Sequence, residues 1–159
     1  MDRFADRRVI VTGAGSGIGA ATTARLLVEG ATVVAFDITP DGLAATAATA
    51  AEAGTEKRLT TAVLDIAVEV DVVAAVDTAV ADLGGLDVLV NVAAMQTCSH
   101  THETTRAEGN RTLAVNLTGR SEERFSRNAE TVAVISYAVF CLKKKNFFND
   151  TATTEIYTH

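Results

Sequence analysis

The stretch VIVTGAGSGIGA at residues 9–20 decides the fold of this chain. Three β-branched residues predict a strand, four glycines follow within residues 13–19, and the alanine- and leucine-rich residues 20–29 are typical of a helix. Glycine suits such a turn because it adopts positive φ easily and because a side chain would keep the backbone and the helix N-terminus away from a phosphate. The order of strand, glycine turn and helix therefore predicts a dinucleotide-binding turn, in which a pyrophosphate lies on free N–H groups.

A second strand supports this interpretation. Residues 31–36, ATVVAF, are typical of a buried strand, and Asp37 follows them, eighteen residues after Gly19. A carboxylate at this place accepts hydrogen bonds from the ribose hydroxyls of adenosine and repels the additional phosphate of NADP. The sequence therefore favours NAD over NADP. The alternative that stays open is that Asp37 only caps the turn before Pro40.

Strand and helix patterns alternate along residues 7–118. Strands are predicted at 7–12, 32–36, 58–64 and 86–91, and helices at 18–29, 41–53, 69–83 and 105–118. Right-handed connections between parallel strands then give an α/β, Rossmann-like doubly wound sheet with the strand order 3-2-1-4. We expect this sheet to be truncated after the fourth strand and its following helix, which leaves the fourth strand as an exposed edge and the chain prone to aggregate.

The glycine turn resembles that of the short-chain dehydrogenase/reductase family. Thr12, Gly13, Gly17 and Gly19 match the family's TGxxxGxG motif at every fixed position. This spacing differs from the GxGxxG of other Rossmann enzymes. The match favours the cofactor-binding part of a short-chain dehydrogenase/reductase.

Three later segments extend the resemblance. LDI at 64–66 contains an aspartate where the family places one near the adenine ring, and NVAA at 91–94 is similar to the family's NNAG segment. LAVNLTG at 113–119 resembles the helix that carries the structural and proton-relay asparagine, here Asn116. The resemblance implies a supporting catalytic role for Asn116 and cofactor contacts at Thr12, Gly13, Ser16, Gly17, Ile18, Gly19, Asp37, Asp65, Ile66, Asn91 and Ala93.

The resemblance also implies an oxidoreductase that transfers a hydride between NAD(H) and a secondary alcohol or ketone. The family's reaction uses a Tyr-x-x-x-Lys pair, because an unassisted tyrosine titrates near about 10 and needs a neighbouring ammonium group to exchange protons at neutral pH. Tyr137 and Tyr157 are the only tyrosines, and Cys141 stands four residues after Tyr137. Ser136, twenty residues after Asn116, is not assigned as the catalytic serine. We therefore expect the chain as it stands to be inactive.

Composition changes after Gly119. KKKNFF at 143–148 contains three of the four lysines and residues with codons rich in A and T, whereas the preceding residues use GC-rich codons. NDTATTEIYT at 149–158 resembles a translated sequencing-library adapter. We therefore expect an NAD-binding Rossmann fragment over 1–119, an out-of-frame segment over 120–145 and an adapter-like artefact over 146–159. A divergent, naturally truncated C-terminus is the alternative.

Charge and hydropathy exclude several classes of partner. The net charge is −6, from 14 basic and 20 acidic residues, which disfavours nucleic acid as a partner. No apolar run reaches the roughly 18 residues of a membrane span, and residues 1–8 lack the apolar segment of a signal peptide. We expect a cytoplasmic protein with a small-molecule substrate, and the resemblance implies a homo-oligomer. The alternatives are a non-catalytic NAD-binding module and an artefactual chimeric reading frame with no function.

One segment superficially resembles a metal site. SHTHE at 99–103 holds two histidines and a carboxylate, but the remaining ligands are missing, so no metal is expected. The resemblance places this loop on the substrate side. Cys98 and Cys141 lack a CxxC spacing and are expected to be structural or incidental.

Overall fold

The computed structural model describes residues 2–96 and 103–119 and the backbone of 133–136. Its sheet is parallel throughout, in the order β3-β2-β1-β4-β5. The strands are β1 (Arg8–Thr12), β2 (Thr32–Asp37), β3 (Leu59–Val63), β4 (Val88–Asn91) and β5 (Ala133–Ser136). The helices are α1 (Gly17–Val28), α2 (Pro40–Glu52), the 3₁₀ turn η1 (Glu56–Arg58), α3 (Glu69–Leu83), α4 (Arg106–Leu113) and the π turn η2 (Ala114–Gly119).

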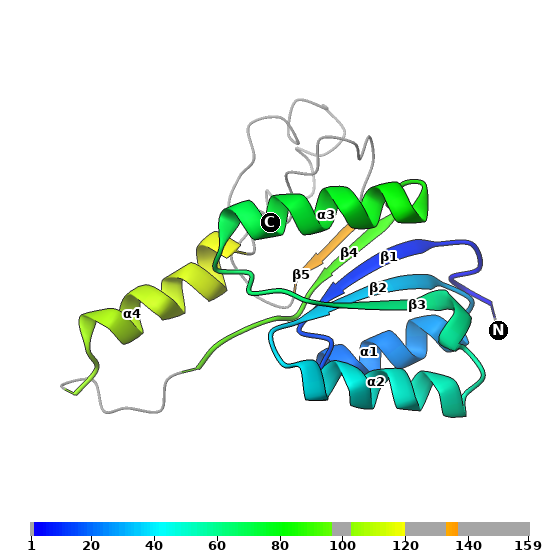
Figure 1. The fold of residues 1–159 in the computed structure, drawn as a ribbon, viewed down its shortest axis with the longest axis horizontal. Helices are drawn as coiled ribbons and strands as arrows, with labels where there is room; N and C mark the ends of the chain where they lie inside the picture. Colours follow the sequence, from blue (N-terminus) through cyan, green and yellow to red (C-terminus); the bar gives the residue numbers. More distant parts are fainter. Residues whose placement is uncertain (1, 97–102, 120–132, 137–159) are drawn as a thin grey trace, which may run out of the picture.

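Helices cover both faces of the sheet, as Figure 1 shows: α1 and α2 lie on one side and α3 on the other. Side chains of a strand alternate between the faces, so Val9 and Val11 pack with Leu27 of α1, whereas Ile10 packs with Val76 of α3. All three β1 residues are fully buried. The predicted α/β class, the parallel pairing and the order 3-2-1-4 are confirmed.

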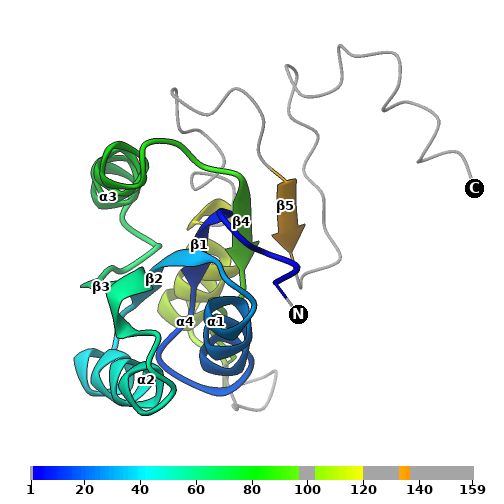
Figure 2. The same cartoon turned by 90° about the vertical axis from the view of Figure 1, so that its right-hand side faces the viewer.

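The expectation that β4 forms the exposed edge of the sheet is wrong. The backbone of β5 pairs in parallel with β4, with Val88 opposite Ala133 and Asn91 opposite Ser136 (Figure 2). The unusual composition of residues 120–145 obscures this strand, although the β-branched pair Val134 and Ile135 suits a strand beside an unpaired edge. In the described part of the chain, the edge strands are β3 and β5.

The predicted helix over 105–118 changes its winding at Ala114. It begins with Thr105, whose side chain accepts the N–H of Glu108 while the Glu108 carboxylate accepts the N–H of Thr105. This reciprocal capping satisfies N–H groups that a helix start otherwise leaves without acceptors. Beyond Leu113 the backbone continues as the π turn η2, a winding that often marks functional sites.

Ion pairs hold the end of the sheet where β1 and β4 begin. Arg8 donates to Asp87 through Nε at 2.9 Å, Nη2 at 3.0 Å and its backbone N–H at 2.8 Å. These side-chain and backbone hydrogen bonds lower the pKa of Asp87 to about 2. A second ion-paired group centres on Glu29 at the end of α1. Its side chain is almost fully buried and forms ion pairs with Arg3 and Arg25. The hydrogen bond from Arg3, aided by Arg25, lowers the pKa of Glu29 to about 2.

None of the helices in the described residues combines the length and the apolar composition that crossing a bilayer requires.

Candidate functional site

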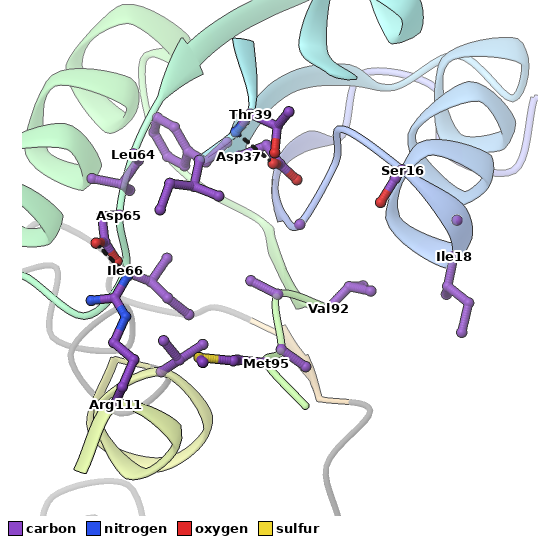
Figure 3. Close-up of a pocket in the computed structure, with 17 residues that line it drawn as sticks. Ser16, Ile18, Asp37, Thr39, Leu64, Asp65, Ile66, Val92, Met95 and Arg111 are labelled. Atoms are coloured by element: carbon purple, nitrogen blue, oxygen red, sulfur yellow. Dashed lines mark hydrogen bonds and ion pairs between the residues drawn. The ribbon is translucent and has the colours of Figure 1, made fainter. Parts of the chain in front are cut away.

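A cleft of about 640 Å³ lies at the carboxyl ends of β1 to β4 (Figure 3). Parallel sheets of this type bind ligands at this edge, where the strand order reverses. The glycine turn and Ile18 form one side of the cleft, and Asp65 and Arg111 lie on the opposite side. The predicted site residues that line it are Gly13, Ser16, Gly17, Ile18, Asp37, Asp65, Ile66 and Ala93.

At two positions of the glycine turn, backbone atoms leave no room for a side chain. Gly13 has φ +70°, and a Cβ there would lie 2.6 Å from the backbone nitrogen of Ala93. A Cβ on Gly19 would lie 1.9 Å from the carbonyl oxygen of Gly13. Glycine at these positions therefore lets α1 and the segment after β4 approach the turn closely.

The start of α1 offers hydrogen-bond donors to the cleft. Gly17 has φ +49°, lines the cleft and has open space where a Cβ would lie. The first N–H groups of a helix lack intrahelical acceptors, and the side chain of the N-cap residue Ser16 makes no capping hydrogen bond. Backbone N–H groups at a helix N-terminus can bind the pyrophosphate of a dinucleotide when no side chain lies between them and the ligand.

Asp37 lies beside this turn, at the end of β2. Its Oδ2 accepts the N–H of Gly15 at 2.8 Å, and its Oδ1 accepts the N–H of Thr39, also at 2.8 Å. The turn-capping contact considered from the sequence is therefore present, and the same carboxylate lines the cleft. An ionised carboxylate has about four acceptor positions, so Asp37 retains capacity for ribose hydroxyls.

Asp65 follows β3 and is held at both carboxylate oxygens. Oδ1 accepts the N–H of Ala67 at 3.0 Å, and Oδ2 pairs with Nη2 of Arg111 at 2.6 Å. Partial desolvation opposes ionisation, but the Ala67 N–H and the Arg111 guanidinium outweigh it, and the pKa of Asp65 lies below its usual value. The side chain is therefore an ionised hydrogen-bond acceptor at neutral pH.

Four predicted site residues do not line the cleft, namely Thr12, Gly19, Asn91 and Asn116. Asn116 in η2 instead holds the segment after β4, because its Oδ1 accepts the N–H of Met95 at 2.8 Å and its Nδ2 donates to the Met95 carbonyl at 2.7 Å. Thr12 and Asn91 are fully buried and lie opposite each other at the ends of β1 and β4. Asn116 therefore positions one wall of the cleft without lining it.

The cleft also contains residues that the sequence did not predict. They are Phe36, Ile38, Thr39, Leu64, Val92, Ala94, Met95, Arg111 and Val115. Most are neighbours of predicted residues and could have been included by extending each motif by one or two positions. Arg111 had no such signal, since its partner Asp65 is 46 residues away.

The described residues contain no group of three potential metal ligands. Residues 99–102 of the SHTHE segment lie outside them, as do both cysteines and both tyrosines. Ser136 is described only through its backbone in β5.

A family model described as short chain dehydrogenase matches residues 7–122, which include every part of the cleft. The chain belongs to the short-chain dehydrogenases. Levodione reductase of Leifsonia aquatica is 36% identical over 118 residues, which are 74% of this chain and 44% of the relative. Cis-4-hydroxycyclohexanecarboxylate dehydrogenase of Sinomonas cyclohexanicum is 42% identical over 120 residues, covering 74% of this chain and 47% of the relative.

Solved short-chain dehydrogenases share the fold. Carveol dehydrogenase from Mycobacterium avium, in complex with NAD, superimposes with a TM-score of 0.70 at 29% identity and covers 77% of this chain and 49% of its own. Levodione reductase superimposes with a TM-score of 0.70 at 34% identity, covering 76% of this chain and 47% of its own. The chain thus spans about half the length of these relatives. It belongs to an oxidoreductase family that binds nicotinamide cofactors and acts on small molecules.

Proposed function

We propose that this chain supplies the NAD site of a short-chain dehydrogenase that transfers a hydride between NAD(H) and a secondary alcohol or ketone. One observation carries the proposal: the turn at residues 12–19 excludes a Cβ at Gly13 and Gly19 and opens the start of α1 to the cleft beside Asp37. A dinucleotide requires such an approach of backbone N–H groups to its pyrophosphate.

The chain's own residues would hold the cofactor at three places. The N–H groups at the start of α1 would bind the pyrophosphate, Asp37 would accept the ribose hydroxyls, and Asp65 would lie at the adenine. Asn116 would keep Met95, and with it the segment after β4 that forms one wall of the cleft, in position. When bound, the nicotinamide ring supplies or accepts the hydride.

Asp37 supports NAD as the preferred form. Its carboxylate is fixed by the N–H groups of Gly15 and Thr39 and cannot easily turn away from the cleft. The additional phosphate of NADP would bring negative charge against this group, and like charges placed together cost several kcal/mol.

A second candidate function is binding without catalysis. Within the 159 residues neither tyrosine is followed by lysine four positions later. We infer that the NAD site lies in residues 1–119, that 146–159 is foreign to the domain, and that the chain alone binds NAD without turnover. Residues 120–145 include β5, which pairs with β4, so only their frame, and not their place beside the sheet, is in question. The homo-oligomer implied by the family is proposed only for the whole protein.

The proposal is tested by titrating the full chain with NADH and with NADPH. Binding is measured by calorimetry and by nicotinamide fluorescence. We expect saturable NADH binding that is at least about tenfold tighter than NADPH binding, and no oxidation of NADH with a panel of ketones. Absence of NADH binding by a chain with native circular dichroism would overturn the proposed site. Turnover of a ketone would instead overturn the non-catalytic assignment.

A further inference from the structure

Arg111 reaches the cleft from α4 and contacts the residue that follows β3. Its Nη2 lies 2.6 Å from Oδ2 of Asp65, and the two side chains are partly exposed at the same wall of the cleft. In Figure 3 the pair lies across the cleft from Ser16 and Ile18. The contact joins two residues that are 46 positions apart in the chain.

The Asp65 carboxylate is oriented from two independent directions. The N–H of Ala67 in its own turn binds Oδ1 at 3.0 Å, and Arg111 binds Oδ2. Without the second contact, the carboxylate would be fixed only by its own turn and could rotate. With both contacts it has a defined orientation and unused acceptor positions, because each oxygen accepts up to two hydrogen bonds.

A fixed, ionised carboxylate distinguishes between purine bases. Adenine carries an amino group at C6, which donates hydrogen bonds, whereas hypoxanthine and guanine carry a carbonyl oxygen there, which only accepts them. A carboxylate also only accepts. The amino group can therefore satisfy it, and a carbonyl oxygen facing it would leave both groups without a donor.

We propose that Arg111 is a positioning residue for base recognition: by fixing the Asp65 carboxylate it makes the cleft prefer a 6-amino purine dinucleotide over a 6-oxo purine dinucleotide. The inference rests on the proposed function, since it requires that the cleft hold a dinucleotide with its base at Asp65. Arg111 acts through Asp65, so its removal changes the preference between bases more than the ability to bind a dinucleotide.

Calorimetric titration of the full chain with NAD and with nicotinamide hypoxanthine dinucleotide tests this role. The measured quantity is the ratio of the two dissociation constants. We expect the unmodified chain to prefer NAD by about tenfold or more, because a hydrogen bond to a charged group contributes about 1.5 kcal/mol or more. Arg111→Met should reduce the ratio to about twofold, and Arg111→Lys, which keeps the charge but not the planar donor geometry, should give an intermediate ratio.

Two further variants separate positioning from a general structural effect. Arg8→Met removes a guanidinium–carboxylate pair at the other end of the sheet, so it should lower the melting temperature and leave the ratio unchanged. The double variant Asp65→Asn with Arg111→Met should show the same ratio as Asp65→Asn alone, because Arg111 has no separate effect on the base.

The outcomes distinguish the two proposals. A chain that binds neither dinucleotide overturns the proposed function together with this inference. A chain that binds NAD, but whose Arg111→Met variant retains the original ratio with native circular dichroism, overturns only the role of Arg111. If Arg111→Met does not fold, the ratio of Arg111→Lys decides: a reduced ratio supports the role and an unchanged one overturns it.

Discussion

The two ends of the parallel sheet are built from different chemistry. At the end where the strands begin, Arg8 and Asp87 satisfy one another, and Glu29 is enclosed by two arginines. At the carboxyl ends of the strands, close approach depends on glycine, and Asp37 is held by backbone N–H groups. Charges at the first end neutralise each other, whereas at the second end Asp37, and Asp65 even with Arg111 beside it, retain acceptor positions for a ligand. The difference indicates that stability and binding are supported at opposite ends of one sheet.

We expect the largest effect on stability and binding from a side chain introduced into the glycine turn. Gly19→Ala places a Cβ 1.9 Å from the Gly13 carbonyl oxygen, so α1 must shift away from the turn. We expect a loss of stability of about 3 kcal/mol or more and the loss of measurable NADH binding. Chemical denaturation and fluorescence titration would measure the two effects.

Gly109→Ala is the matched control for that variant. Gly109 lies in α4 with open space where a Cβ would be, and alanine favours a helix over glycine by about 1 kcal/mol. We expect slightly increased stability and unchanged NADH binding. Equal damage from both variants would show that the glycine turn is not the specifically sensitive part of the fold.

Removal of the Arg8–Asp87 pair should affect stability but not binding. Arg8→Met leaves Asp87 without its guanidinium partner at the start of β1 and β4. We expect a lower melting temperature with an NADH dissociation constant within about twofold of the original. A large loss of NADH affinity in the folded variant would show that the two ends of the sheet are coupled.

Asp37→Asn should change cofactor preference with a smaller effect on stability. Asparagine keeps an acceptor for the Gly15 or Thr39 N–H but removes the negative charge. We expect the preference for NADH over NADPH to fall by about tenfold, measured by parallel calorimetric titrations. If the preference does not change, Asp37 acts only as a cap for its turn.

Acid should weaken the end of the sheet that holds Asp87. The pKa of Asp87 is about 2 in the folded chain, below the value of about 3.9 for an unperturbed aspartate. The stabilisation is therefore fully present above about pH 4 and is lost as the pH falls towards 2. Denaturation midpoints between pH 6 and pH 2 should fall less steeply for Asp87→Asn than for the unmodified chain. Parallel pH profiles would show that other groups dominate the acid response.

Local patterns predicted the elements because each one carries its own signal. The glycine turn, the apolar strands and the helix periodicity predicted the order 3-2-1-4 and most element bounds within two residues. Asp37 was found because it stands at the end of a predicted strand, and the carboxyl ends of parallel strands meet at one edge. Asp65 was found through the resemblance to the family.

Long-range contacts were not predictable in the same way. Arg111 meets Asp65 only after α4 has been placed over the end of β3, and nothing in the residues around Arg111 specifies that placement. Asn116 was identified by resemblance, but its two hydrogen bonds to Met95 became evident only in three dimensions. The fifth strand was missed because pairing along an edge depends on what lies beside it.

The segment formed by α4 and η2 touches the cleft walls at two separate strands. Arg111 holds the residue after β3, and Asn116, five positions later, holds the segment after β4. The number of residues between these two side chains fixes their relative direction, because each residue adds a rotation about the helix axis in α4 and in the π-wound η2. A deletion between Arg111 and Asn116 would let only one of the two contacts form. The short segment from Arg111 to Asn116 therefore links the two walls, and its length decides whether both contacts form together.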